Sequence, residues 1–122
     1  MSSVGKNCTA LIDRETFDDF ADLFNAAELR EVIEEWHADC AKALDAIAQA
    51  QAEGDSARIG QLAHRAAGGG MALGATALAR TCERLRAAAE SGAPVTDEEI
   101  APVREAVEAT YTALADAAAD SQ

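Results

Sequence analysis

The chain has 122 residues and a formal net charge of −12 at pH 7, and its length suits one domain. An acidic excess of this size argues against nucleic acid or a membrane surface as partner, because both are bound through clustered Lys and Arg side chains. Hydrophobic residues make up 49%, much of it alanine, with two prolines and 4% aromatic residues, which favours an all-helical domain over any sheet.

The sequence shows no apolar run long enough to span a bilayer and no signal peptide with a basic start and an apolar centre. We therefore expect a cytoplasmic protein. The three cysteines, Cys8, Cys40 and Cys82, are too widely spaced for a disulfide framework or a zinc site. Cys40 and Cys82 fall on apolar helical stripes, where we expect small buried thiols.

The domain is expected to span residues 13–119, after a flexible N-terminus over residues 1–12 that lacks helical periodicity. Asp13 is expected to cap a short, phenylalanine-rich helix. Four longer helical segments follow, and helices joined by short turns pack antiparallel. We therefore predict an all-α fold: an up-down-up-down four-helix bundle with a short extra N-terminal helix covering one end.

Start signals define the first two of these longer helices. Asn25 and Glu28 have the spacing of a capping box and open a long helix that runs to about Ala52. Asp55 follows a turn and is expected to cap the next helix, which ends or bends near a run of glycines. The third helix is expected over residues 76–90.

The start of the last helix carries conflicting signals. Thr96 and Glu99 have the spacing of another capping box. Pro102 lacks a backbone N–H and disrupts a helix interior. We expect this helix to start nearer Ala101 or to bend early.

The helix after Asp55 carries one histidine on the face opposite its apolar stripe. The stripe consists of Ile59, Leu62, Ala66 and Leu73. His64 is expected to point into solvent, with Gly60 at i−4 and Gly68 at i+4, so that no side chain covers it along the helix axis. With both ring nitrogens accessible, this imidazole is a candidate nucleophile.

Three consecutive glycines follow this histidine at 68–70, although each glycine inside a helix costs about 1 kcal/mol relative to alanine. Gly68 lies on the face of His64 and is expected to allow close approach by a partner. The other two lie near the core stripe, where they serve either helix packing or a helix end. Met71 suits either the core or a docking patch.

The stretch from His64 to Ala75, HRAAGGGMALGA, is followed at helical spacing by Leu78, Cys82 and Leu85. This pattern resembles the signature of histidine-containing phosphotransfer (HPt) domains, and the resemblance covers roughly residues 13–119. In that signature the histidine is followed by a glycine four positions on, a hydrophobic–Gly–Ala step, and later a leucine, a cysteine and a leucine. One position departs from it: the family has a lysine where this chain has Ala67.

The resemblance implies a phosphotransfer protein of a two-component phosphorelay. His64 would accept a phosphoryl group, through Nε2, from the aspartate of one receiver domain and pass it to another. The surrounding residues expected to contact the receiver domain are Gln61, Arg65, Ala67, Gly68 and Met71.

The partners implied are receiver domains of response regulators or of hybrid histidine kinases. Because the receiver would supply Mg²⁺, no cofactor and no metal site is expected in this chain. The protein would be a phosphocarrier rather than a true enzyme, without autokinase activity, and we expect a monomer.

Two alternatives accompany this interpretation. Because Ala67 replaces the lysine, the chain could be a pseudo-HPt interaction module that docks receiver or kinase domains without taking phosphate, unless Arg65 compensates. A metal-binding bundle is the other alternative, since Glu34 and His37 have the spacing of a di-iron ligand pair. The sequence contains no second copy of that pair, so the ligand count is too low.

Overall fold

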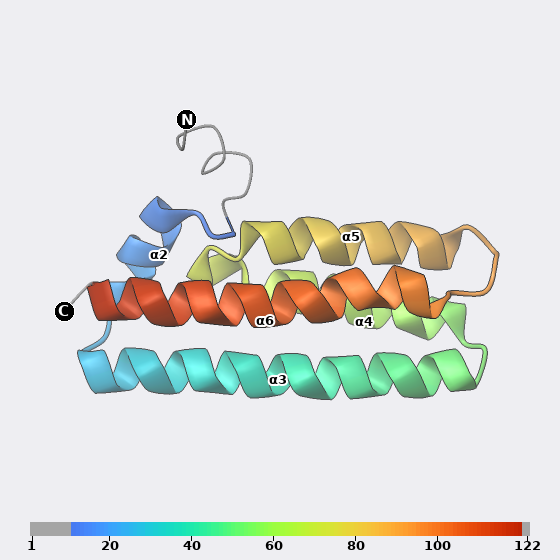
Figure 1. Ribbon diagram of the computed structural model, residues 1–122, viewed down its shortest axis with the longest axis horizontal. Helices are drawn as coiled ribbons and strands as arrows, with labels where there is room; N and C mark the ends of the chain where they lie inside the picture. Colours follow the sequence, from blue (N-terminus) through green and yellow to red (C-terminus); the bar gives the residue numbers. More distant parts are fainter. Residues whose placement is uncertain (1–10, 121–122) are drawn as a thin grey trace.

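The described part of the chain, residues 11–120, is built from helices in the computed structural model. The elements are α2 (Arg14–Ala21), α3 (Ala26–Ala52), α4 (Ser56–Gly69), the 3₁₀ turn η1 (Met71–Leu73), α5 (Thr76–Glu90) and α6 (Asp97–Asp120). The four long helices run alternately in opposite directions, and α2 lies at the end of the bundle where α6 finishes (Figure 1). The predicted all-α bundle with its short N-terminal helix is confirmed. None of the helices described is both long and apolar enough to cross a membrane.

The four long helices close a ring around a common core. α3 and α5 each pack against both α4 and α6, and the α4–α5 contact is the most extensive. The largest fully buried aliphatic and aromatic side chains are Phe17, Ile33, Ile47, Ile59, Leu78, Leu85 and Leu114. Each contributes about 1.5–3 kcal/mol by leaving water. Phe17 comes from α2, so this short helix closes one end of the core.

The predicted helix starts of α3 and α4 are confirmed by their hydrogen bonds. The Glu28 N–H donates to Asn25 Oδ1 at 2.8 Å and the Asn25 N–H donates to Glu28 Oε1 at 3.0 Å, which completes the capping box of α3. Asp55 Oδ1 accepts from the Arg58 N–H at 3.1 Å at the start of α4. These bonds satisfy N–H groups that have no partner within their own helix.

Of the two expectations for the last helix, the start near Ala101 is wrong, because α6 begins at Asp97. An early bend at Pro102 stays a prediction. The Glu99 N–H donates to Thr96 Oγ1 at 3.2 Å, and the Thr96 N–H donates to Glu99 Oε1 at 2.9 Å. This second capping box fixes the helix start before the proline, and Pro102 stands inside the helix.

The chain that enters α2 is tied to the bundle. The first ten residues of the predicted flexible N-terminus lie outside the described residues. Leu11, which the sequence groups with them, accepts a hydrogen bond from the Ala77 N–H at 3.3 Å, and Ile12 packs against the core. Asp13 stands at the N-cap of α2 as predicted. Its carboxylate accepts from the Thr16 hydroxyl at 2.7 Å rather than from a backbone N–H.

Two of the three cysteines, Cys40 and Cys82, are buried free thiols, as their positions on apolar stripes predict. Burial raises the pKa of Cys40 to about 12 and that of Cys82 to about 11, so both stay protonated at neutral pH. Cys8 lies outside the described residues.

The turn between α4 and α5 requires glycine at two positions. A Cβ on Gly70 would lie 2.9 Å from Ala75 Cβ and 3.1 Å from Trp36 Nε1. Gly74 has a φ of +83°, and a Cβ there would lie 2.6 Å from the carbonyl oxygen of Asp13. The Asp13 N–H donates to the Gly74 carbonyl at 2.8 Å. The backbone of this turn, which leads into α5, therefore packs directly against the backbone that leads into α2.

We expect Gly74→Ala to destabilise the fold more than Gly92→Ala, as measured by urea unfolding. Both glycines have positive φ, which costs an L-residue about 1–2 kcal/mol. Only at Gly74 would the added methyl group also collide with backbone, since nothing lies within 4 Å of a Cβ on Gly92. Equal losses in the free energy of unfolding would contradict the tight α2 contact.

Candidate functional site

His64 lies on α4 with its side chain 70% exposed, as its position opposite the apolar stripe predicts. Its Nδ1 is engaged in a hydrogen bond, 3.1 Å from Glu83 Oε2 on the neighbouring helix α5. Of the two ring nitrogens expected to be free for chemistry, one is therefore already occupied. Among the described residues, only Nδ1 has a hydrogen-bond partner, so Nε2 is the nitrogen left for chemistry.

The two glycines that flank His64 have different surroundings. Gly68 is exposed, and nothing lies within 4 Å of a Cβ placed on it, as predicted. Gly60 is buried against α5, where a Cβ would meet Ala89 Cβ at 3.6 Å and Arg86 Cγ at 3.7 Å. The interpretation of Gly60 as part of a bare face around His64 is wrong: it serves the close packing of α4 on α5.

The buried face of α4 is wider than its predicted stripe because the helix packs against both α3 and α5. Ile59, Leu62 and Leu73 are buried as expected, whereas Ala66 is only half-buried. Ala67 is 7% exposed and belongs to the α4–α5 contact. Position 67, where Hpt-like sequences have a lysine, is therefore buried between the helices rather than exposed at the edge of the site.

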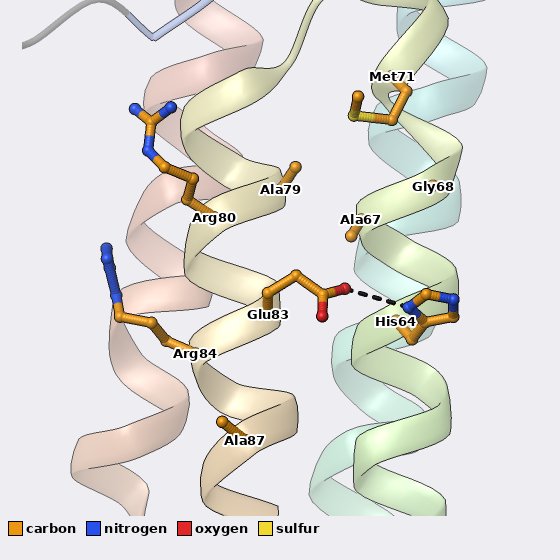
Figure 2. A pocket seen from close by; sticks show the side chains of 9 residues that line it. All are labelled: His64, Ala67, Gly68, Met71, Ala79, Arg80, Glu83, Arg84 and Ala87. Atoms are coloured by element: carbon orange, nitrogen blue, oxygen red, sulfur yellow. Dashed lines mark hydrogen bonds and ion pairs between the residues drawn. The ribbon is translucent and has the colours of Figure 1, made fainter.

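A shallow hollow of about 640 Å³ lies between α4 and α5 beside His64 (Figure 2). Its lining consists of His64, Ala67, Gly68, Met71, Ala79, Arg80, Glu83, Arg84 and Ala87. Met71, 51% exposed, stands at one end, and small side chains form most of the surface between the helices. The hollow thus offers an apolar surface with the imidazole at its edge.

Of the expected contact residues, Ala67, Gly68 and Met71 line this hollow together with His64. Arg65 does not: it lines a separate groove between α3 and α4. Gln61 is exposed on α4 but is not part of the lining. Arg65 is therefore on the wrong side of α4 to compensate for the missing lysine.

The α5 side of the hollow was not anticipated from the sequence. It consists of Ala79, Arg80, Glu83, Arg84 and Ala87. These residues recur at spacings of three and four beside the buried stripe of α5, and that pattern marks one helix face. The pattern could have been found in the sequence, but not the alignment of α5 along α4 that brings Glu83 to His64.

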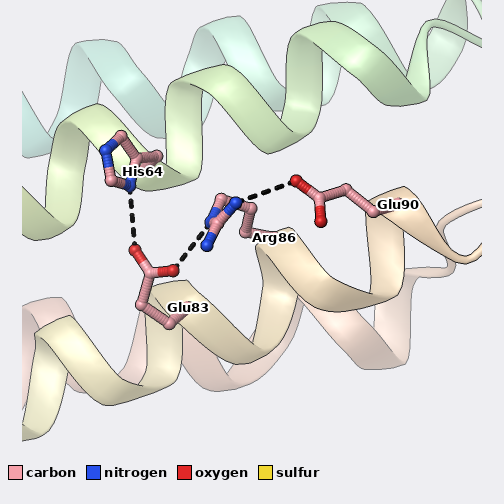
Figure 3. A network of polar contacts seen from close by, with 4 residues as sticks. All are labelled: His64, Glu83, Arg86 and Glu90. Atoms are coloured by element: carbon pink, nitrogen blue, oxygen red, sulfur yellow. Dashed lines mark hydrogen bonds and ion pairs between the residues drawn. The ribbon is translucent and has the colours of Figure 1, made fainter.

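Glu83 is held in its charged form by its neighbours. Hydrogen bonds from Arg86, at 2.7 Å, and from His64 lower its pKa below the ordinary value. Arg86 also donates to Glu90 Oε2 at 2.9 Å, which extends the network along α5 (Figure 3). A carboxylate therefore faces His64 Nδ1 at neutral pH.

The helix pair around the hollow is basic although the protein is acidic. Residues 56–90 contain five arginines and two carboxylates, whereas the rest of the chain contains five basic and twenty acidic residues. Within the described residues, neither Arg80 nor Arg84 makes an ion pair or a side-chain hydrogen bond, and both are exposed. The face thus carries positive charge that no side chain of the described residues neutralises.

The second histidine has a structural role. His37 Nε2 lies 2.9 Å from Glu108 Oε2, and the ring stacks on Tyr111 at 3.9 Å between centroids. The Tyr111 hydroxyl donates to Glu34, so the Glu34–His37 pair links α3 to α6. Residues 11–120 contain no group of three or more His, Cys, Asp or Glu side chains placed to hold a metal ion.

Comparison with known proteins gives one result. The sequence pattern of the family described as Hpt domain matches residues 26–117, which include the whole of α3, α4 and α5 and most of α6. The chain has no match among curated proteins and none among solved structures.

Proposed function

The chain belongs to the Hpt domain family, which places it in the phosphotransfer of two-component signalling with receiver domains as partners, and we propose that His64 carries the phosphoryl group. An aspartyl phosphate of one receiver domain transfers its phosphoryl group to His64 Nε2, and the aspartate of a second receiver domain then accepts that group. The observation that carries the proposal is the position of the imidazole. It is 70% exposed at the edge of an apolar hollow, and only its Nδ1 is engaged.

The chemistry requires little from this chain beyond a positioned nucleophile. The neutral imidazole uses the Nε2 lone pair to form the N–P bond as the aspartate O–P bond breaks. Phosphoryl transfer depends mainly on alignment and charge stabilisation, to which the receiver contributes Mg²⁺. We propose a monomeric, cytoplasmic phosphocarrier that receives its phosphoryl group from a receiver domain rather than by autokinase activity.

The hollow and its arginines suit a receiver domain as partner. Gly68 and Ala67 present little bulk beside His64, so a partner surface can approach the imidazole closely. The phosphorylation site of a receiver is built around an aspartate and is acidic, and Arg80 and Arg84 complement that charge.

We expect His64→Gln to abolish acid-labile phosphoryl labelling by a phosphorylated receiver domain, because the only proposed acceptor atom is removed. His37→Gln is the matched control and should be labelled at the wild-type rate, since His37 lies at the α3–α6 contact. Labelling that survives in His64→Gln would contradict the proposal. If the wild type binds receivers but is never labelled, the docking-module alternative is correct.

We expect the double variant Arg80→Glu, Arg84→Glu to bind receivers at least about tenfold more weakly, mainly through slower association. The control, Arg30→Glu with Arg104→Glu, changes the net charge equally but on α3 and α6. The difference in association rate between the wild type and the first variant should shrink at high salt, because salt screens exposed charges. An equal effect of both variants would indicate net charge rather than a docking face.

We expect Gly68→Ala to slow phosphotransfer by about tenfold or more, because a methyl group beside His64 displaces the reacting groups. Gly69→Ala is the control, since it lines the other groove of α4. Neither Cβ meets an atom within 4 Å, so both variants should be more stable by roughly 0.5–1 kcal/mol in thermal unfolding. Equal transfer rates in the two variants would exclude Gly68 from the docking surface.

A further inference from the structure

A second groove lies between α3 and α4, and it shares no lining residue with the hollow beside His64. Its volume is about 640 Å³. Pockets that hold small ligands have volumes of about 300–1,000 Å³. The lining residues of α3 extend from Val32 to Ala46, so at a rise of about 1.5 Å per residue the groove is about 20 Å long. The groove thus has the size and the elongated shape of a site for a small, extended molecule.

The floor of this groove is apolar and only partly covered by the bundle. Val32 and Ala46 of α3 and Ala66 of α4 pack against the core but remain half-buried. Trp36 and Leu73, both buried, belong to the same lining. Because apolar surface gains by leaving water, hydrocarbon that covers this floor would bind favourably.

Three cations line the same groove without a counter-ion. Lys42, Arg58 and Arg65 are exposed, and within residues 11–120 none of their side chains makes an ion pair or a hydrogen bond. The chain contains 22 acidic residues, so this lack of partners does not come from a shortage of carboxylates. Arg58 and Arg65 are separated by seven positions, which places them on one face of α4, and such side chains can lay their stems along an apolar floor.

The charges of the groove are separated along its length. Since α3 and α4 are antiparallel and joined by a short turn, Lys42 lies level with Arg65 (Figure 1). The two carboxylates of the lining, Glu35 and Asp39, lie farther from that turn, on the part of α3 that leads toward Trp36 and α2. An anionic group is therefore attracted to the half of the groove near the turn and repelled from the other half.

We propose that this groove binds a free, single-chain carboxylate amphiphile of the fatty-acid class. Lys42, Arg58 and Arg65 bind the carboxylate, for which a guanidinium offers paired N–H donors. The alkyl chain lies on the apolar floor and points toward Trp36. This site goes beyond the proposed function and does not depend on it.

The test uses the fluorescence of Trp36, the one tryptophan of the chain, during titration of the full-length protein with decanoate below its micelle concentration. We expect a saturable change. Decyltrimethylammonium has the same chain with a cationic head, and hexanoate has the same head with a shorter chain. Each should bind at least about tenfold more weakly, because one loses the charge attraction and the other buried methylene groups. Absence of saturable binding, or equal binding of the cationic amphiphile, overturns the inference.

A pair of double variants tests the arginines. We expect Arg58→Gln with Arg65→Gln to weaken decanoate binding about tenfold, since both guanidinium partners of the carboxylate are lost. The control, Arg30→Gln with Arg104→Gln, removes the same charge at exposed positions outside the groove and should bind like the wild type. Thermal unfolding checks that all variants are folded. An unchanged affinity in the first variant contradicts the proposed site.

Two other occupants of the groove are distinguished by sedimentation. Binding to vesicles of anionic phospholipid without binding of decanoate assigns the groove to a membrane surface. A dimer that the Arg58→Gln, Arg65→Gln variant disrupts assigns it to a second copy of the chain. Either result overturns the inference. His64→Gln should bind decanoate like the wild type, so that failure of this site and failure of the phosphotransfer are observed separately.

Discussion

The close approach of α4 and α5 is the constraint on which the site depends. Small residues make it possible: Gly60 is buried, and a Cβ there would already meet Ala89 Cβ at 3.6 Å, while Ala67 is 7% exposed in the same contact. At this separation a glutamate of α5 reaches His64 on α4 with a 3.1 Å hydrogen bond. Larger residues at the contact would move the helices apart and remove the carboxylate from Nδ1. The small side chains that let α4 and α5 pack closely therefore also let Glu83 reach His64.

The turn after α4 determines where along α4 each residue of α5 lies. Gly70 admits the Trp36 ring and Ala75 at distances that no Cβ would allow, and its carbonyl oxygen accepts from the Ala75 N–H at 3.0 Å. Gly74 then takes a positive φ against the backbone of Asp13. A change of one residue in this turn would rotate α5 by about 100°. Glu83 would then face away from the imidazole.

The sequence predicts features formed by residues within one helical turn, but it does not predict contacts between residues of two different helices. The capping box at Asn25 and the apolar stripes need only residues three or four apart, and both are present in the structure. The contact between His64 and Glu83 joins residues nineteen apart, and it depends on the register of α5 along α4. The role of Gly60 is not predictable from the sequence for the same reason, because a glycine one turn from a histidine has the same spacing whether it admits a partner or a neighbouring helix. Arg65 could be placed only once the structure showed that a second groove borders α4.

Ala67 and Glu83 are best understood together. Both line the hollow beside His64, so a lysine at position 67 would bring an ammonium group next to the carboxylate. That ammonium group would compete with His64 Nδ1 for Glu83, since exposed carboxylates pair readily with nearby cations. With alanine there, Glu83 is left to the imidazole and to Arg86, and positive charge comes instead from Arg80 and Arg84 on α5. In place of the lysine of the family, the hollow therefore carries a carboxylate against His64 Nδ1 and, on the neighbouring helix, two exposed arginines.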